Sequence, residues 1–516
     1  MKSFTILLVI LIGMNVSVAQ EVDSTALLFD DSIVHEFNIV FYYPDWEDSL
    51  TYWYEHGEEY IPARIEYAGL VFDSVGVRYK GNSSYTMARR TPKKPLKFKF
   101  DEYRSKQECF DVEKLNFSNA TKDPTFLREK LCYDILRTRT HAPRAAWAAI
   151  HVDGALLGLY TMVEQVDKKF LKRHFADNDF NLYKSADDGA TLEYLGSSGD
   201  DYKREFELKT NEDEDDWSRF VQMVQVLNQA PDATFRTLAG AWIDFKSAVM
   251  MLAFNMVLGN FDSYTGSGRN FYIYDDQEGG QFTFIPWDIN EGFGAYSNNW
   301  NVFTQDVLNV SNLQRRPLNR RIVSDELLRA DYLRAIAELV GSAAHEDSIA
   351  AHIARFTPLI DPWVRADQYK LYTYQNFLDN IHSDVVIGIN MSVPGLTRFS
   401  QTRNAALRTQ LQNYAALSAD DIPKAAALTA DVYPNPVTST STLVYSLPAA
   451  GSVRCVVYDA LGRAVRRIDA ASQEPGTHQY SMDMTDLSPG VHFYHLFHTD
   501  GSGNVAQTTG RITVLH

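Results

Sequence analysis

Two aspartates in the middle of the chain, each followed by an asparagine, have the residue types that phosphate chemistry uses. Asp262 lies in a loop after a long apolar stretch, and Asn270 follows it eight positions later. Asp288 ends the strand-like sequence Phe284-Ile285-Pro286-Trp287-Asp288, and Asn290 follows two positions later. A carboxylate can orient or deprotonate a hydroxyl group, and Asp or Asn oxygens can hold a magnesium ion. These residues are therefore candidates for the acid and the metal ligands of phosphoryl transfer.

A small turn and a basic strand precede these acids in the sequence. The turn, Lys80-Gly81-Asn82-Ser83-Ser84, follows a strand, and its glycine allows a phosphate to approach backbone N–H groups and hydroxyls. In the run 96–100, strand alternation places Lys97 and Lys99 on one face and apolar residues on the other. Each feature alone is more typical of an ordinary turn or a solvated strand face. Together they predict a surface that neutralises a polyphosphate.

The order of these clusters along the chain adds information that none of them carries alone. The phosphate turn comes first, then the basic strand, the acid-bearing loop and the strand-end aspartate, which is the order of parts in a protein-kinase-like fold. Between them, Glu164 and Asp167 end a strand where a hinge between two lobes is expected. Glu129 lies on the helix that would carry the ion-pair partner of a nucleotide-binding lysine.

Alternating strands dominate the first part of the region that must position these residues, and helices dominate the second. Strands are predicted at 37–41, 71–79, 96–100, 146–152, 156–163, 270–274 and 281–285. A helix is expected after Asp123 and Pro124, which resemble an N-cap and a first helical residue, and another over 242–258. From about 324 to 416 the pattern is helical. We therefore predict an α+β fold with two lobes.

The composition and the N-terminus indicate an exported protein. The net charge of −17 argues against a nucleic-acid partner, because phosphate backbones attract an excess of Lys and Arg. Residues 1–19 have the features of a signal peptide, with Lys2, the apolar run 6–14 and a cleavage site at Ser17-Val18-Ala19. A later apolar stretch long enough to span a membrane is not found, so we expect a mature chain without a transmembrane segment.

Only three cysteines are present, Cys109, Cys132 and Cys455, which is too sparse and uneven a set for a disulfide framework. A single bridge between Cys109 and Cys132 and three buried free thiols are both compatible with the sequence. A zinc site has no support.

Residues 425–516 form a separate domain with short alternating strands and frequent turn residues, which predicts a small all-β sandwich. Three motifs occur in it in order: Val432-Tyr433-Pro434-Asn435-Pro436, then 457–463, then 487–494. This succession resembles the type A C-terminal sorting domain of the type IX secretion system. The resemblance implies recognition by the type IX secretion machinery and a secreted or outer-cell-surface product that passes through the periplasm.

The preceding region, 20–424 with a core at about 35–415, resembles the CotH (spore coat protein H) kinase family. The stretches that carry this resemblance are 75–84, 94–100, 126–137, 158–167, 181–184, 259–262, 269–274, 286–288 and the helix from Arg403. The family implies an atypical protein-kinase-like fold of two lobes. It also implies ATP and magnesium as cofactors and phosphorylation of serines in Ser-rich partner proteins.

The resemblance assigns roles by position. Asp262 would be the catalytic acid and Asp288 the metal-binding aspartate with Asn270 as its helper. One of Lys80, Lys97 and Lys99 would meet the phosphates, with Lys99 slightly favoured, and Glu164 and Asp167 would lie near the adenine. Many members of the family have an aspartate where this chain has Asn290. That amide carries less charge for a metal.

Two functions follow from these assignments. The first is an exported Ser/Thr protein kinase, favoured by the retained Asp262 and Asp288. The second is a non-catalytic surface adhesin or pseudokinase scaffold on the same fold, favoured by export into a space poor in ATP and by Asn290.

Overall fold

A computed structural model of the chain describes most residues between Ser24 and Leu515, so the expected signal peptide lies outside the described residues. The described ranges are 24–310, 312–388, 391–421, 428–433, 435–447, 449–460, 463–474, 476–501 and 505–515. The chain divides into two compact units, 1–412 and 413–516. Among the described residues, none of the helices has the length and apolar character that a membrane span requires.

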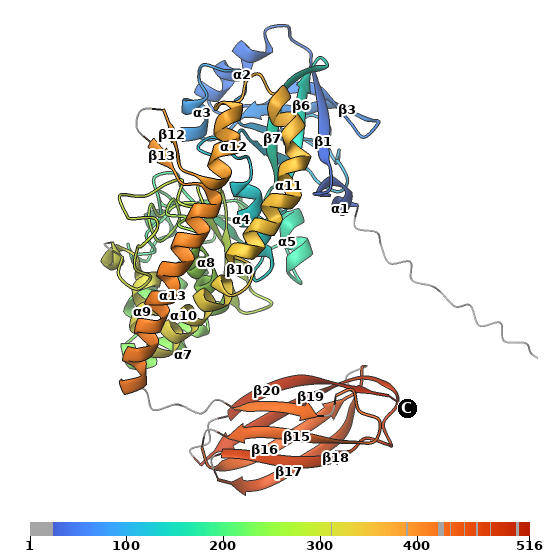
Figure 1. Ribbon diagram of the computed structural model, residues 1–516, viewed down its shortest axis with the longest axis vertical. Helices are drawn as coiled ribbons and strands as arrows, with labels where there is room; N and C mark the ends of the chain where they lie inside the picture. The colour runs from blue at the N-terminus through green and yellow to red at the C-terminus, as the bar shows by residue number, and fades with distance from the viewer. Residues whose placement is uncertain are drawn as a thin grey trace, which may run out of the picture. The chain divides into compact units, whose positions relative to one another are not determined.

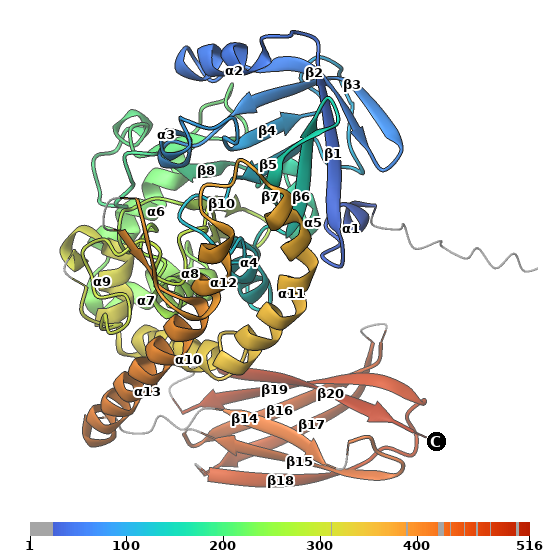
Figure 2. The same ribbon diagram turned by 45° about the horizontal axis from the view of Figure 1, so that its top comes forward.

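Seven strands at the start of the first unit close into a barrel (Figure 2). Their order is β1-β2-β3-β4-β5-β7-β6, with β1 parallel to β6 and the other neighbours antiparallel. Apolar side chains such as Phe37, Val77 and Phe98 alternate inward along the strands and fill the barrel. The strands are β1 (Val34–Phe41), β2 (Ile61–Tyr67), β3 (Leu70–Tyr79), β4 (Leu96–Lys99), β5 (Lys114–Ser118), β6 (Ala145–Val152) and β7 (Ala155–Glu164).

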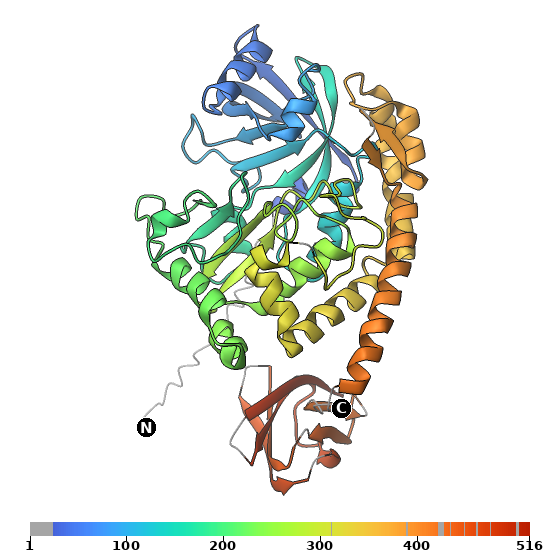
Figure 3. The same cartoon turned by 90° about the vertical axis from the view of Figure 1, so that its left-hand side faces the viewer.

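The rest of the first unit combines a second sheet with most of the helices. The sheet has the order β11-β10-β8-β9, and Figures 1 and 3 show the barrel at one end of the unit and this sheet with its helices at the other. Its strands are β8 (Leu182–Ser185), β9 (Phe206–Leu208), β10 (Phe271–Asp276) and β11 (Gln281–Pro286). The short helices of the barrel side are α1 (Thr25–Leu28), α2 (Trp46–Glu55), α3 (Ser83–Met87), α4 (Arg128–Arg137) and α5 (Lys168–His174).

The remaining helices surround the second sheet or run along the unit. They are α6 (Ser218–Gln229), α7 (Phe235–Gly240), α8 (Phe245–Val257), α9 (Pro317–Ser324), α10 (Glu326–Val340), α11 (Glu346–Ala366), α12 (Tyr374–His382) and α13 (Leu396–Asp421). Helix α8 is apolar on nearly every face and accordingly buried, and the Asp244 side chain caps it by accepting a hydrogen bond from the Lys246 N–H at 3.0 Å. This cap explains why α8 begins later than the expected Trp242. The α+β prediction is confirmed.

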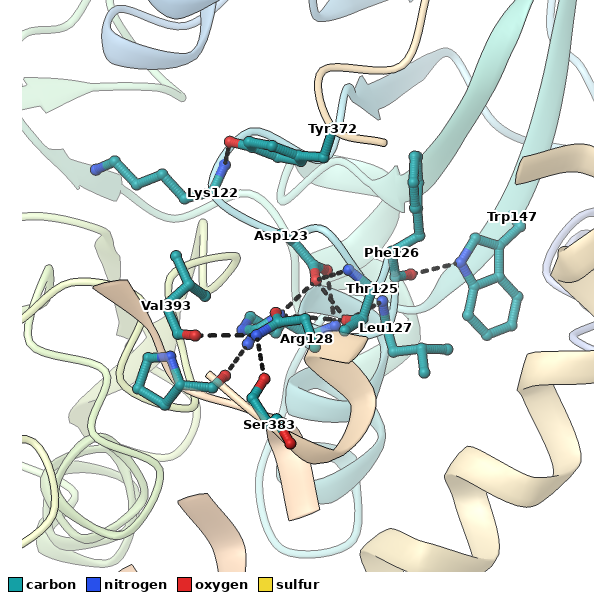
Figure 4. Close-up of polar contacts among 12 residues, drawn as sticks. Lys122, Asp123, Thr125, Phe126, Leu127, Arg128, Trp147, Tyr372, Ser383 and Val393 are labelled. Carbon is teal, nitrogen blue, oxygen red and sulfur yellow. Dashed lines mark hydrogen bonds and ion pairs between the residues drawn. The ribbon is translucent and has the colours of Figure 1, made fainter. Parts of the chain in front are cut away.

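The helix expected from Asp123 starts later, at Arg128, so that prediction of its first turn is wrong. Phe126 has φ 56°, a left-handed conformation that a helix cannot contain. The Asp123 carboxylate instead accepts hydrogen bonds from the backbone N–H groups of Thr125 (3.0 Å) and Arg128 (2.9 Å). It also forms an ion pair with the Arg128 guanidinium at 2.8 Å. Arg128 also donates to the Pro394 carbonyl, and Figure 4 shows this buried network joining α4 to the segment before α13.

The region predicted to be helical from 324 to 416 also contains a short hairpin, β12 (Val385–Ile387) and β13 (Met391–Val393). The three cysteines are free and buried, so the bridge between Cys109 and Cys132 is not formed. Both outcomes depend on tertiary packing rather than on local sequence pattern.

After the last turns of α13, the described part of the second unit is all-β, as predicted. One sheet has the order β14-β15-β18 and the other β17-β16-β19-β20, and both contribute to one hydrophobic core, with Leu443 from the first and Val457 and Leu496 from the second. The strands are β14 (Thr429–Tyr433), β15 (Thr440–Leu447), β16 (Gly451–Tyr458), β17 (Ala464–Gln473), β18 (Gly476–Asp483), β19 (Gly490–Asp500) and β20 (Val505–Val514).

A fully buried ion pair fastens helix α11 to the barrel in the first unit. The Lys93 ammonium lies 2.5 Å from the carboxylate of Asp367, which follows α11, and both side chains have no exposed surface. The same carboxylate accepts a hydrogen bond from the Leu159 N–H of β7 at 3.1 Å. A side chain on the neighbouring Gly158 would collide with both charged groups. Figure 2 shows α11 lying next to β6 and β7.

Replacing Lys93 by Met should destabilise the first unit by about 3–5 kcal/mol, because it leaves the Asp367 carboxylate buried without its counter-charge. All tryptophans lie before residue 413, so tryptophan fluorescence during urea unfolding reports on this unit alone. Arg334→Met, which breaks an exposed pair with Asp331, is the control and should cost less than about 1 kcal/mol. Equal costs for the two variants would contradict the prediction.

Candidate active site

A polar cavity of about 890 Å³ has walls from both the barrel and the second sheet. Its lining includes most of the residues singled out in the sequence and several that were not. From the expected set these are Lys80, Gly81, Asn82, Ser83, Ser84, Lys97, Asp167, Asp262, Asn270, Asp288 and Asn290. The structure thus brings together residues that are up to about two hundred positions apart in the sequence.

The hairpin of β10 and β11 brings Asn270 and Asp288 to the same side of the cavity. Phe271, the first residue of β10, pairs with Pro286, the last of β11, so the residues just outside these strands are neighbours. The Trp287 N–H donates to the Asn270 carbonyl at 3.0 Å. Asn270 and Asp288 have φ values of 65° and 47°, in the left-handed region, which Asn and Asp adopt more readily than other non-glycine residues.

Asp262 reaches the cavity from the loop after α8 and is held there by Asn270. The Asn270 side-chain amide donates to the Asp262 carbonyl at 2.7 Å and to its carboxylate at 3.1 Å. The end of α8 is fixed in turn by Arg403 of α13, which is fully buried and donates to the Met256 carbonyl at 2.8 Å. The loop that carries Asp262 therefore begins from an anchored helix end.

Lys80 lies among the acids of the cavity. Its ammonium lies 5.7 Å from the centre of the ring of Trp287, the residue that precedes Asp288. Burial lowers the pKa of Lys80, and the nearby charges of Asp288 and Glu129 oppose that shift. Glu129 on α4 is 4% exposed, and burial together with the charge of Asp288 raises its pKa to about 8. Lys80, which lines the cavity, thus interacts electrostatically with the buried Glu129.

Four lysines of the cavity wall form no ion pair with any described residue. They are Lys80, Lys97, Lys114 and Lys184. Burial lowers the pKa of Lys97 well below its ordinary value, and the charges of Arg78, Lys80 and Lys114 add to this shift. A group of lysines whose charges repel one another is suited to binding a polyanion.

The glycine turn lies on the same wall. Gly81 has φ 76°, and a side chain there would collide with the Ser84 hydroxyl, so this position requires glycine. The Tyr54 hydroxyl donates to the Gly81 carbonyl at 2.6 Å and fixes the turn from the side of α2. The turn continues directly into the short helix α3.

Two expected residues lie away from the lining of this cavity. Lys99 lies on the same strand face as Lys97, but it forms an ion pair with Glu102 at 2.7 Å. Glu164 is buried beside Arg144, at 2.7 Å, and also pairs with Arg173. Asp167, by contrast, lines the cavity and caps α5 by accepting from the Lys169 N–H at 3.0 Å.

Glu291 is a lining residue that the sequence reasoning did not select. It is 6% exposed, and one carboxylate oxygen accepts from the Lys122 ammonium at 2.6 Å while the other has no partner. Burial raises its pKa to about 7, and the charge of Asp262 adds to the shift. The sequence contained a sign of this role, because Glu291 directly follows Asn290. Position 290 is where a carboxylate was expected and an amide is found.

The residues of the cavity fit a magnesium ion that is bound together with a nucleotide. Clusters of three or more His, Cys, Asp or Glu side chains arranged for a metal are not found among the described residues. Magnesium bound with a nucleotide needs only one or two carboxylates, because phosphate oxygens and waters complete its coordination. Asp288, Asn270 and Asn290 can supply oxygen ligands of this kind from one side of the cavity.

Two family models match the chain. The model described as CotH kinase protein matches residues 77–415, and the model described as secretion system C-terminal sorting domain matches 431–507. The sorting domain identifies a substrate of type IX secretion, which delivers the chain to the cell surface or the extracellular space. The expected localisation and both expected resemblances are confirmed.

A curated relative and a solved structure are also similar to parts of the chain. Inner spore coat protein H of Bacillus subtilis (strain 168) is 27% identical over 273 residues, which cover 52% of this chain and 73% of that protein. The crystal structure of CopC from Methylosinus trichosporium OB3b covers 17% of this chain and 91% of that chain, with 18% identity and a TM-score of 0.14. A score that low supports no inference.

Replacing Glu129 by Gln should reduce the pH dependence of stability between about pH 4.5 and pH 8. The folded-state pKa of Glu129 is raised to about 8, so the stability it contributes is complete below pH 4.5 and is lost as the pH rises. The difference in unfolding free energy, variant minus wild type, should therefore be more positive at pH 8 than at pH 5. Unfolding free energies from tryptophan fluorescence measure this. Glu338→Gln, on the exposed side of α10, is the control. The same pH dependence in wild type and Glu129→Gln would contradict the assignment.

Proposed function

Because the chain belongs to the CotH kinase protein family, we propose that it is an exported protein kinase that transfers the γ-phosphate of ATP to Ser or Thr of partner proteins. One observation carries this proposal. A single cavity holds Asp262 and Asp288 together with four lysines that form no ion pair among the described residues. Carboxylates for a hydroxyl and a metal, together with cations for phosphates, are the parts that phosphoryl transfer requires.

In this proposal the barrel and the second sheet with its helices are the two lobes of a kinase-like fold, and the cavity lies between them. The segment 165–167, which joins β7 to α5 and lines the cavity, is the connection where the adenine would bind. Lys80 takes the role of the phosphate-binding lysine, since Glu129 on α4 stands where its ion-pair partner is expected.

The catalytic roles follow from the positions of the acids. Asp262 orients the acceptor hydroxyl and takes its proton as the hydroxyl oxygen bonds to the γ-phosphorus. The bond from that phosphorus to the bridging oxygen breaks, and ADP leaves. Asp288 holds the magnesium ion, with Asn270 and Asn290 as further oxygen donors. Magnesium, when bound with ATP, neutralises charge on the phosphates. Asn270 also keeps Asp262 in place through its two hydrogen bonds.

Asp288→Ala and Asp262→Ala should each reduce transfer of radiolabelled phosphate to a Ser-rich acceptor protein by at least about 100-fold. Asp331→Ala, on the exposed side of α10, matches the change in charge and should keep wild-type activity. Chelation of magnesium by EDTA should abolish transfer and restored magnesium should recover it. A wild type that neither transfers label nor binds ATP in calorimetry would favour the surface adhesin or scaffold instead.

Lys80→Met and Lys99→Met test which of these two lysines contacts the phosphates. Lys80→Met should weaken ATP binding at least about 10-fold, because it removes a charge-assisted contact to phosphate. Lys99→Met should leave binding unchanged, because Lys99 lies outside the cavity lining and pairs with Glu102. Calorimetry with ATP and magnesium measures both. The opposite order of effects would assign the phosphate contact to Lys99.

A further inference from the structure

A second polar cavity, of about 630 Å³, lies next to the loop that carries Asp262. It shares no lining residue with the larger cavity. Three arginines, three acids and several uncharged polar residues form most of its walls. The principal members are Arg204, Arg315, Arg316, Asp188, Asp201, Glu205, Gly266, Ser267 and Asn312.

The loop 262–269 contributes to the walls of both cavities. Asp262 and Arg269 line the larger cavity, whereas Gly266 and Ser267 line the smaller one. The loop is fixed on the side of the second cavity, because the Asn312 side-chain amide donates to the carbonyls of Thr265 (2.9 Å) and Gly266 (3.0 Å). A ligand in the second cavity would therefore contact the same rigid loop that presents Asp262.

Arg316 is a buried cation of the second cavity without a carboxylate partner. Its side chain is 7% exposed and donates to the carbonyls of Gly266 (2.9 Å) and Arg315 (3.2 Å), while its Nε has no partner. Within the described part of the chain, none of Arg204, Arg315 and Arg316 forms an ion pair. Burial lowers the pKa of Arg316, and a bound anion would offset that cost.

Two of the three acids of this cavity accept hydrogen bonds from neighbouring residues, whereas Asp188 is exposed. The Glu205 carboxylate accepts hydrogen bonds from the Thr191 N–H (2.8 Å) and the Thr191 hydroxyl (3.0 Å). The Asp201 carboxylate accepts from the Ser198 N–H at 3.3 Å as part of a capping box. The Ser267 hydroxyl and the Asn312 side-chain oxygen are buried without a partner. The wall thus offers a ligand three guanidinium groups, the Ser267 hydroxyl and the Asn312 side-chain oxygen, with the Asp188 carboxylate also in the lining.

We propose that this second cavity binds an anionic side chain, a carboxylate or a phosphoryl group, of the acceptor polypeptide. Guanidinium groups recognise both anions through charge-assisted hydrogen bonds. The inference rests on the proposed kinase function for the identity of the ligand. From Asp262 to Gly266 the chain spans at most about 14 Å, the reach of four extended residues. Four extended residues of an acceptor peptide are therefore enough to span this distance, so the test places the anionic residue within about four positions of the acceptor serine.

The test measures binding of fluorescein-labelled serine peptides to the purified full chain by fluorescence anisotropy, without ATP. Three peptides of one sequence carry Glu, phosphoserine or Gln at the positions within four residues of the acceptor serine. At least one anionic peptide should bind about 10-fold or more tightly than the Gln peptide. Comparison of the Glu and phosphoserine peptides tells which anion is preferred.

Arg316→Gln and the double variant Arg204→Gln/Arg315→Gln should remove this preference. The double variant changes only exposed side chains, so it keeps the test valid if Arg316→Gln fails to fold. Arg236→Gln, an exposed arginine of α7 outside this cavity lining, is the matched control and should bind as the wild type does.

Binding and phosphate transfer are read separately. Equal binding of the three peptides by the wild type, or an anion preference that survives in both arginine variants, would overturn the inference while leaving the kinase function intact. A preference lost in these variants without any transfer of label would support the anion site and contradict the kinase function.

Discussion

The site depends on holding several carboxylates close together where little water reaches them. Glu129 is buried, Asp288 and Glu291 line the larger cavity, and burial raises the pKa of all three. The charge of Lys80 opposes this shift at Glu129 and Asp288, and the charge of Lys122 opposes it at Glu291. An arrangement of this kind is costly without bound cations, and it persists because the surrounding hydrogen bonds and strands fix the backbone. Its electrostatic cost is the reason to regard it as functional rather than as packing.

The same constraint explains why the lysines opposite the acids lack partners. If Lys97, Lys114 and Lys184 formed ion pairs with the acids, neither set would be free for a ligand. The barrel strands β4 and β5 and the sheet strand β8 hold the lysines, whereas the β10–β11 hairpin and the loop after α8 hold Asp288 and Asp262. A nucleotide with its magnesium ion carries charges of both signs and complements such a divided surface.

Sequence pattern was sufficient for seven strands of the first unit and for most of the expected site residues, which line the cavity, but it missed β2, β5, β8 and β9. The alternation of Leu96, Lys97, Phe98 and Lys99 appears in the structure as expected, with the apolar residues buried. Sequence pattern could not distinguish Lys97 from Lys99, because both lie on one face of the strand. Which of the two reaches the cavity depends on where the second sheet lies relative to β4. The start of α4 was misplaced for a related reason. Asp123 makes cap-like hydrogen bonds, but the left-handed Phe126 delays the helix.

Some roles depend on distant partners, which sequence pattern does not show. Glu291 acquires its raised pKa from burial and from Asp262, which is far from it in sequence, and its position next to Asn290 was the only sign of this in the sequence. Arg316 is unusual because it is buried without an ion pair to any described residue and its Nε has no hydrogen-bond partner there. Both lie near the loop that carries Asp262. Glu291 lines the larger cavity together with Asp262, and Arg316 donates a hydrogen bond to the Gly266 carbonyl of that loop. Anchoring that loop by Asn270, Asn312 and Arg316 from different sides means that a ligand in either cavity meets a preformed surface. The cost of ordering the loop is then met in folding rather than in binding.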